Sequence, residues 1–194
     1  MINNNMIRIG IIGLGYVGLP LAIEFGKKFN VVGFDKNPVR IFDLKSSLDK
    51  NKDIKKKQFK QSKKLNFSNN LIDLKKCNIY IIAVPTPITS RKKPKLKYIK
   101  EACLDVSSIL KKDDIVIFES TVYPGLTEEF CVPILQRKSG LAYNKDFFCG
   151  YSPERINPND KIHRLKNIVK ITSGSNNYTA NFVDNLYKKI VTVG

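Results

Sequence analysis

The sequence has few of the side chains that bind structural metals or form disulfides. Its 194 residues include one histidine and four cysteines, without a C-x-x-C pair or zinc-finger spacing. A chain of this length buries about 70% of its unfolded surface and needs no such cross-links. We therefore predict no metal site, and four free thiols in a reducing, cytoplasmic environment. The cysteines are Cys77, Cys103, Cys131 and Cys149.

The sequence also lacks an apolar run long enough to cross a membrane. The charge-free stretch Ile9–Ile23 has 15 residues, whereas a transmembrane helix needs about 20. Four glycines and Pro20 interrupt it, and no small-x-small cleavage site follows, as a signal peptide would require. We predict no membrane partner. Because no internal repeat or linker is visible, we also expect a single domain.

Acidic residues are scarce, 17 against 34 basic ones, which gives a formal charge of +17. Such a charge is typical of proteins that bind nucleic acid or anionic membranes. However, the lysines are spread over the whole chain, and the densest stretch, residues 45–64, contains one aromatic residue, Phe59. Single-strand binders interleave aromatic residues with basic ones, and base readers favour arginine. We therefore interpret the charge as a solvated surface and predict no nucleic-acid partner.

The first 35 residues have the order strand, glycine loop, helix, strand. The apolar run Ile7–Ile12 predicts a strand buried on both faces, and Val31–Asp35 predicts a second one. Between them lies the sequence Gly13-Leu14-Gly15-Tyr16-Val17-Gly18, followed by apolar residues at helical spacing up to Phe29. This order is typical of the βαβ unit that binds dinucleotides.

Each part of this unit has a physical task in binding a dinucleotide. Gly13 permits the tight turn, Gly15 lets the backbone approach the pyrophosphate, and Gly18 lets the helix pack close to the strand. The helix N-terminus presents unpaired N–H groups and a positive dipole to the phosphates. Tyr16 and Val17, between the glycines, are further candidate cofactor contacts, although Tyr16 would pack equally well on the helix.

Asp35 decides the expected cofactor. It ends the second strand, where a carboxylate accepts hydrogen bonds from the adenosine ribose and repels a 2′-phosphate. Arg40 and Lys36 lie nearby, and basic residues there accommodate that phosphate. Because Asp35 occupies the position that faces the ribose, we predict NAD rather than NADP, with Arg40 as an additional cofactor contact.

The rest of the chain repeats the alternation of helices and strands. This pattern predicts one α/β domain, a Rossmann-type doubly wound parallel sheet with helices on both faces. The further strands are expected at Leu65–Phe67, Ile79–Val84, Ile115–Phe118, Phe147–Tyr151 and Ile168–Ile171. The further helices are expected at Pro38–Lys45, Leu71–Cys77, Leu96–Leu110, Leu126–Gln136 and Tyr178–Ile190, and residues 45–64 are expected to form either a surface helix or an irregular excursion.

Ligands of such sheets bind outside the carboxyl ends of the strands, and three loops expected there have distinctive sequences. They are Val84-Pro85-Thr86-Pro87, the run from Glu119-Ser120-Thr121 to Gly125, and Ser152-Pro153-Glu154-Arg155 with the residues up to Pro158. Together with the glycine loop, these motifs resemble the UDP-glucose/GDP-mannose dehydrogenase family. The resemblance is collinear over essentially the whole chain, and it is strongest for the bacterial branch that acts on UDP-N-acetylhexosamines.

The resemblance implies a two-step oxidation of a sugar C6 alcohol to a uronic acid with two NAD+, for surface polysaccharide synthesis. The implied substrate is a nucleotide-sugar, UDP-N-acetylglucosamine or UDP-N-acetylgalactosamine. In the family, Thr121 and Glu154 hold a water near C6, with Glu154 as general base, and Arg155 contacts the substrate. The alternative is that Glu154 only caps the next segment. The implied contacts of the nicotinamide half are Val84, Pro85, Thr86, Ser120 and Thr121.

Two departures from the family pattern are visible. Asn159 replaces a glycine, and the family's nucleophilic cysteine has no counterpart among the four cysteines. We therefore expect residues 1–194 to be the NAD-binding domain, without the central helix and the UDP-sugar-binding domain. The chain alone would be inactive, and a homodimer or higher oligomer would need the missing half. A short hydroxyacid-type dehydrogenase and a non-catalytic NAD-binding module are the remaining alternatives.

Overall fold

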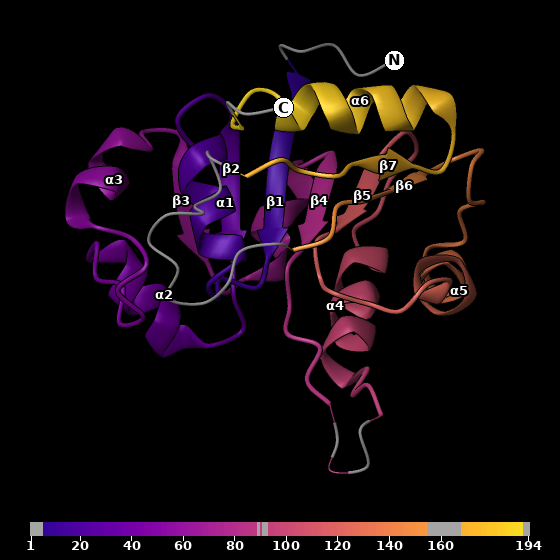
Figure 1. The fold of residues 1–194 in the computed structure, drawn as a ribbon, viewed down its shortest axis with the longest axis horizontal. Helices are drawn as coiled ribbons and strands as arrows, with labels where there is room; N and C mark the ends of the chain where they lie inside the picture. The colour runs from indigo at the N-terminus through magenta and orange to yellow at the C-terminus, as the bar shows by residue number, and fades with distance from the viewer. Residues whose placement is uncertain (1–5, 89, 91–92, 155–167, 192–194) are drawn as a thin grey trace.

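The computed structural model describes residues 6–88, 90, 93–154 and 168–191. Within them, seven strands form one sheet in the order β3-β2-β1-β4-β5-β6-β7 (Figure 1). Neighbouring strands are parallel, except that β7 is antiparallel to β6. The strands are β1 (Arg8–Ile12), β2 (Asn30–Phe34), β3 (Leu65–Ser68), β4 (Ile79–Ile82), β5 (Ile115–Phe118), β6 (Phe148–Tyr151) and β7 (Ser173–Gly174).

Helices cover both faces of the sheet (Figure 1). In β4, Ile79 and Ile81 belong to the core that contains α1, α2 and α6, whereas Tyr80 and Ile82 belong to the core that contains η2, α4 and α5. This covering confirms the predicted doubly wound α/β fold. The helices are α1 (Gly18–Phe25), α2 (Pro38–Lys45), α3 (Lys56–Gln61), the 3₁₀ helix η2 (Leu71–Lys76), α4 (Lys97–Ser107), the π-helical turn η3 (Thr127–Cys131), α5 (Val132–Ser139) and α6 (Asn177–Tyr187).

The strand predicted at Ile168–Ile171 is wrong. These residues lie in no strand, and the edge strand β7 follows at Ser173–Gly174, antiparallel to β6. The sheet is therefore parallel over six strands rather than throughout. The apolar run is typical of a buried strand, but Val169 and Ile171 are exposed and the side chain of Lys170 points into the protein.

Two predicted helices differ from the α-helical form. Leu71–Lys76 is a 3₁₀ helix, and the helix expected from Leu126 begins with the π-helical turn η3. The N–H of Val132 donates to the carbonyl of Thr127, five residues back. Pro133 follows directly, and because it has no N–H and its ring crowds the preceding turn, it disfavours a regular α-helix there.

Asp114 is a buried acid at the sheet edge opposite the carboxyl ends. Its carboxylate accepts a bond from the backbone N–H of Lys111 at 2.8 Å and lies 3.3 Å from the ammonium of the same residue. Burial raises the pKa of Asp114 from 3.8 to about 6, although Lys111 acts in the opposite direction. The folded protein therefore binds this proton more tightly than the unfolded chain does.

The pH dependence of unfolding tests this assignment. A raised folded-state pKa stabilises the protein once the pH falls through about 6, with the full effect below 3.8. We expect the unfolding free energy of the wild type, minus that of Asp114→Asn, to rise by about 3 kcal/mol between pH 7 and pH 3.5. Urea unfolding at both pH values measures it. The control is Asp113→Asn, a substitution of the exposed neighbouring acid. If the difference in unfolding free energy between the wild type and this control changed with pH by the same amount, the raised pKa would not belong to Asp114.

Candidate functional site

An open cavity of about 560 Å³ lies at the carboxyl ends of β1, β2 and β4. The strand order reverses between β1 and β4, and ligands of open α/β sheets bind at such a reversal. The sequence-predicted residues Gly13, Gly15, Asp35, Arg40, Val84 and Pro85 all line this cavity. The other lining residues are Ile12, Leu14, Phe34, Lys36, Asn37, Asn51, Tyr98, Glu101, Ala102 and Asp105.

The glycine loop joins β1 to α1 with a close backbone contact. Gly13 has φ of +92°, a conformation that favours glycine. A Cβ atom on Gly18 would lie 1.8 Å from the carbonyl oxygen of Gly13, so any side chain there is excluded. A Cβ atom on Gly15, by contrast, would have no heavy atom within 4 Å. The backbone at Gly15 therefore faces open space, and no side chain caps the first turn of α1.

These contacts separate the two glycines experimentally. We expect Gly18→Ala to lower the unfolding free energy by about 3 kcal/mol or more, because the methyl group meets immovable backbone. Gly15→Ala should change stability by less than about 1 kcal/mol, yet weaken NADH binding at least tenfold by filling the space beside the loop. Urea unfolding and NADH fluorescence titration measure the two effects. Equal NADH affinity of Gly15→Ala and wild type would show that the pyrophosphate lies elsewhere.

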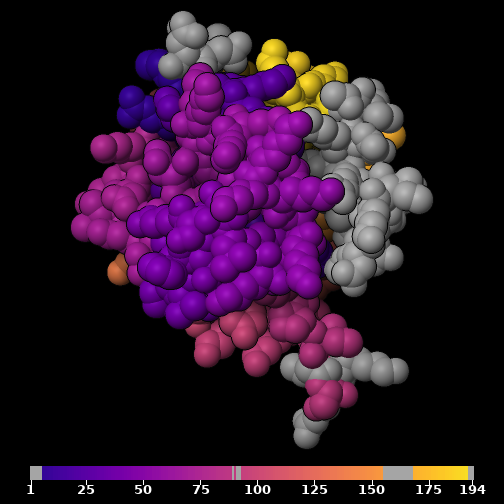
Figure 2. All heavy atoms as spheres, turned by 90° about the vertical axis from the view of Figure 1, so that its left-hand side faces the viewer, coloured from indigo at the N-terminus to yellow at the C-terminus, as the bar shows by residue number. Residues whose placement is uncertain are grey.

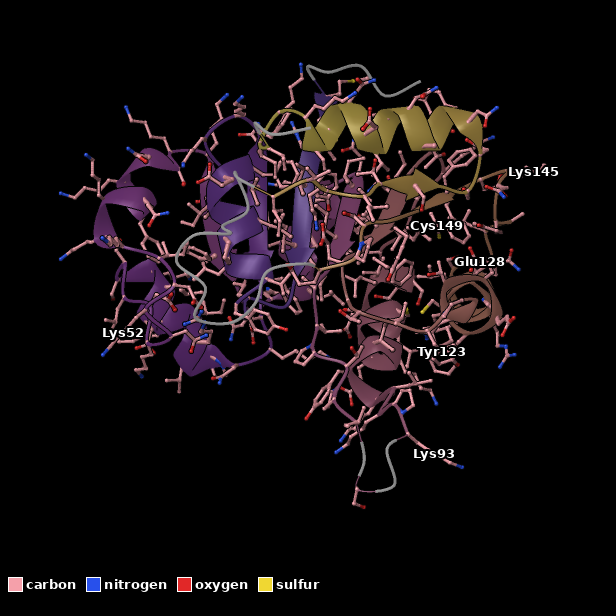
Figure 3. All side chains as sticks on the ribbon, viewed as in Figure 1. Lys52, Lys93, Tyr123, Glu128, Lys145 and Cys149 are labelled. Carbon is pink, nitrogen blue, oxygen red and sulfur yellow. The ribbon has the colours of Figure 1, made fainter. Side chains whose placement is uncertain are left out.

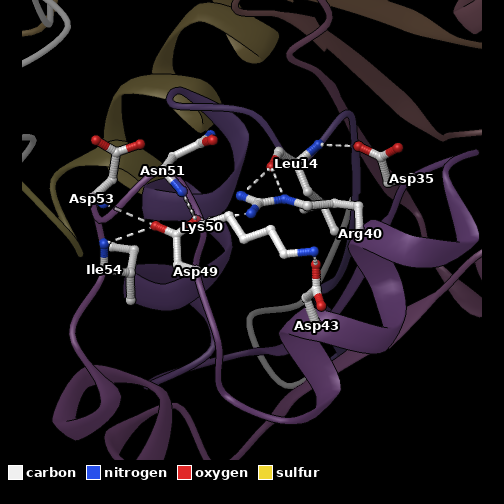
Figure 4. A network of polar contacts seen from close by, with 9 residues as sticks. All are labelled: Leu14, Asp35, Arg40, Asp43, Asp49, Lys50, Asn51, Asp53 and Ile54. Carbon is white, nitrogen blue, oxygen red and sulfur yellow. Dashed lines mark hydrogen bonds and ion pairs between the residues drawn. The ribbon is translucent and has the colours of Figure 1, made fainter.

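Asp35 and Arg40 hold the loop from the side of β2 and α2 (Figure 4). The Asp35 carboxylate accepts bonds from the N–H of Leu14 at 2.9 Å and of Asn37 at 3.0 Å. Arg40 donates from Nε and Nη2 to the carbonyl of Leu14, and its Nη1 pairs with Asp49 at 2.8 Å. Two of the three nitrogen atoms of the Arg40 guanidinium therefore bond to the glycine loop, and the third bonds to Asp49.

The charges around the cavity favour a ribose without a 2′-phosphate. Asp35, Glu101 and Asp105 supply three carboxylates to the lining. Lys36 lies 2.8 Å from Asp105 and 4.0 Å from Glu101, and Arg40 is paired as described. Both cations near Asp35 thus have acidic partners, so an added phosphate would meet more negative than unpaired positive charge.

The loops after β4 and β5 are bonded to each other at the same sheet edge. The Ser120 hydroxyl donates to the carbonyl of Val84 at 2.7 Å, and the Thr86 hydroxyl donates to the carbonyl of Thr121 at 2.6 Å. Ser120 is buried and Thr121 is exposed. The structure thus brings together the residues predicted to contact the nicotinamide half, with the Thr121 side chain accessible from solvent.

Glu119, which precedes Ser120, is fully buried and paired. Its carboxylate lies 2.7 Å from the ammonium of Lys170 and accepts a hydrogen bond from the Tyr187 hydroxyl. Burial raises the pKa of Glu119 to about 6; Lys170 and Tyr187 lower it, whereas the nearby Glu154 carboxylate raises it further. Glu154 thus lies close to this buried group. Arg155 is outside the described residues.

Several site residues were not identified from the sequence. Tyr98, Glu101, Ala102 and Asp105 line the cavity from α4. Their spacing of three and four residues is that of one helical face. They were missed because the apolar pattern of α4 indicates only its buried face. Among the predicted contacts, Val17 is buried in the core and Tyr16 is exposed, and the cavity lining does not include them.

Basic side chains occur on several parts of the described surface. Lys52, Lys93 and Lys145 project from separate regions of the molecule (Figure 3). Figure 2 shows that described residues between β4 and α4, drawn in magenta, stand away from the body of the domain. Over the residues that are described, no helix is long and apolar enough to cross a membrane. In the same part of the chain, no three acidic, histidine or cysteine side chains are gathered so as to hold a metal.

Comparison with known proteins gives the same family as the motifs. Residues 7–191 match the model of the UDP-glucose/GDP-mannose dehydrogenase family, NAD binding domain. The chain is 53% identical over 188 residues to the UDP-N-acetyl-D-glucosamine 6-dehydrogenase of Pseudomonas aeruginosa, covering 97% of the chain and 44% of that protein. It is 47% identical over 187 residues to protein CapL of Staphylococcus aureus, covering 96% and 44%.

A solved structure shares the fold over the same extent. The UDP-N-acetyl-D-mannosamine dehydrogenase of Pyrococcus horikoshii superposes with a TM-score of 0.88 at 32% identity, over 96% of this chain and 46% of that one. The chain thus spans somewhat less than half the length of the relatives that it matches. It belongs to the UDP-glucose/GDP-mannose dehydrogenase family, in which it corresponds to the NAD binding domain.

Proposed function

We propose that the cavity holds NAD(H) with its adenosine ribose on Asp35 and its pyrophosphate over Gly15 and the N-terminus of α1. The nicotinamide half would extend toward Val84 and the loop of Ser120 and Thr121. The observation that supports this placement best is the open space at Gly15, beside an uncapped helix at the sheet's reversal point. The face of α4 that carries Tyr98 and Ala102 would cover the adenine side.

We further propose that this domain serves the oxidation of a UDP-N-acetylhexosamine, such as UDP-N-acetylglucosamine, at C6 to the uronic acid. NAD+, when bound, supplies the hydride acceptor. Glu154 takes the proton of the C6 hydroxyl, and the Thr121 hydroxyl helps to hold a water. The exposed Thr121 side chain and the proximity of Glu154 to Glu119 are consistent with these roles. The second oxidation needs a thiol from a further domain.

The cysteines support a reducing compartment for this reaction. All four are free and buried, and no pair forms a disulfide. We therefore propose a cytoplasmic protein. The self-association of the enzyme is proposed to depend on the part of the relatives that this chain does not match.

The choice of cofactor tests the role of Asp35. We expect NADH to bind at least tenfold more tightly than NADPH, and Asp35→Ala to weaken NADH binding by about 10- to 100-fold, the value of one or two charge-assisted hydrogen bonds. Fluorescence titration measures both. Asp184→Ala, on the surface of α6, serves as the control because its carboxylate pairs with an exposed lysine. Similar affinities for NADH and NADPH would contradict the assignment of Asp35.

A further inference from the structure

Lys170 is a buried charge in a segment whose apolar residues face outward. Its side chain is 4% exposed, whereas Val169 and Ile171 on either side are each 54% exposed. Successive side chains of an extended segment point in opposite directions. A shift by one residue would therefore bury an apolar side chain and return the ammonium to water, the arrangement that the hydrophobic effect favours. The observed register must be selected by the polar contacts of Lys170.

Those contacts join two loops of the proposed site. The ammonium lies 2.7 Å from the Glu119 carboxylate and donates to the carbonyl of Pro153 at 3.3 Å. It also lies 5.5 Å from the ring centre of Tyr187, whose hydroxyl donates to the other oxygen of Glu119. Pro153 immediately precedes Glu154, and Glu119 is two residues before Thr121. One buried ammonium thus connects the backbones that carry the two proposed catalytic residues.

A buried ion pair is a poor source of stability. Removing two charges from water offsets most of their attraction, so that an apolar replacement of similar volume is often equally stable. The pair does impose one geometry, because Glu119, Lys170 and Tyr187 are satisfied together only when the three elements are correctly placed. Misplacement of a catalytic group by about 1 Å lowers a rate up to about 100-fold. The network is therefore better suited to positioning than to stabilising.

We propose that Lys170 is a positioning residue that, held by Glu119, fixes the backbone before Glu154 relative to the loop of Thr121. This inference rests on the proposed function for its catalytic consequence. Its structural part, the connection between the two loops, concerns this chain alone. The two parts are therefore tested separately.

Hydrogen exchange of the 194-residue chain tests the connection. The substitutions Lys170→Met and Glu119→Gln are combined, so that no unpaired charge is left in the core and the variant folds. We expect amide exchange in peptides covering 119–123 and 150–154 to accelerate at least tenfold, with β1 and α1 unchanged. Lys188→Met, which removes an exposed ion pair on α6, is the matched control. Unchanged exchange in both loops, or equal acceleration throughout the sheet, would overturn the proposal.

The catalytic consequence is measured in a fusion enzyme, in which residues 1–194 are joined to the part of the Pseudomonas aeruginosa relative that they do not match. We expect kcat of the double variant to be 10- to 100-fold lower than that of the wild type, while the KM for NAD+ changes less than twofold. The single variant Lys170→Arg, which keeps Glu119 and a positive charge, should retain most of the wild-type rate. An unchanged kcat would overturn the positioning role. An inactive wild-type fusion would count against the proposed function. The connection between the two loops would still be tested, because the hydrogen-exchange measurement does not require activity.

Discussion

The purified 194-residue chain is expected to bind NADH and yet to form no uronic acid from UDP-N-acetylglucosamine or UDP-N-acetylgalactosamine. Oxidation beyond the aldehyde needs a thiol that holds it as a thiohemiacetal. Burial raises the pKa of Cys77 to about 12, and the pKa values of Cys103 and Cys149 are raised as well. Cys131 is fully buried. All four thiols are therefore shielded from solvent and from a substrate aldehyde.

The need to orient the substrate also predicts that the 194-residue chain is inactive. The chain matches 44% of the Pseudomonas aeruginosa relative, and we propose that the sugar is enclosed only together with the part of that protein that these residues do not match. Holding the reacting groups in place lowers the activation free energy by up to about 7–11 kcal/mol. Most of this reduction would be lost. The expected turnover is therefore below detection, whereas the cavity proposed to hold NAD(H) is lined by residues of this chain.

Two assays on one preparation check this expectation. NADH fluorescence titration should give saturable binding, and incubation with NAD+ and either nucleotide sugar should give no increase in absorbance at the NADH band. The four single Cys→Ser variants extend the test. If the wild type formed uronic acid and one of these variants did not, the substituted cysteine would be the nucleophile. Saturable NADH binding without activity in the fusion enzyme would instead favour a non-catalytic NAD-binding module.

Glu154→Gln should lower kcat of the fusion enzyme by about 10²–10⁴, the usual effect of removing one positioned general base. The amide keeps the size of the side chain but cannot take the C6 hydroxyl proton. NADH affinity should stay within about twofold, because Glu154 does not line the cavity that we propose to hold NAD(H). Steady-state kinetics and NADH titration on the same variant separate the two quantities.

Glu128→Gln is the matched control, since Glu128 is an exposed acid on η3. It should leave both kcat and NADH affinity unchanged. A Glu154→Gln effect confined to the KM of the sugar would reassign this residue to substrate binding. No effect at all would mean that Glu154 only caps the segment that follows it.

Local sequence patterns predicted the fold well because the strands are short and the central ones, β4 and β5, are hydrophobic throughout. Every side chain of β4 and β5 is buried, so their apolar runs were sufficient to place them. The glycine spacing was equally informative, since the contact between Gly18 and the Gly13 carbonyl depends on residues only five positions apart. The position of Asp35 at the end of β2 likewise indicated its place in the cavity lining, whereas its contact with the ribose stays a prediction.

The features that the sequence did not reveal depend on distant residues. Lys170 pairs with Glu119, 51 residues earlier, and no local pattern distinguishes an inward-facing lysine from a solvated one. The apolar neighbours Val169 and Ile171 therefore suggested a strand that does not form. Arg40 was predicted to contact the cofactor, and its bonds to Leu14 and Asp49 depend on a loop conformation with no regular periodicity.

The position of α6 has a consequence for synthesis of the protein on the ribosome. Tyr187 packs edge-on against Phe25 of α1, with ring centres 5.6 Å apart, and bonds to Glu119 after β5. The last helix of the described chain thus completes a core begun by the first one (Figure 1). A nascent chain that has not yet extruded α6 cannot bury Phe25 in this way or satisfy the Glu119 carboxylate. Cotranslational folding should therefore stall in a partly ordered state until residues 177–187 leave the exit tunnel.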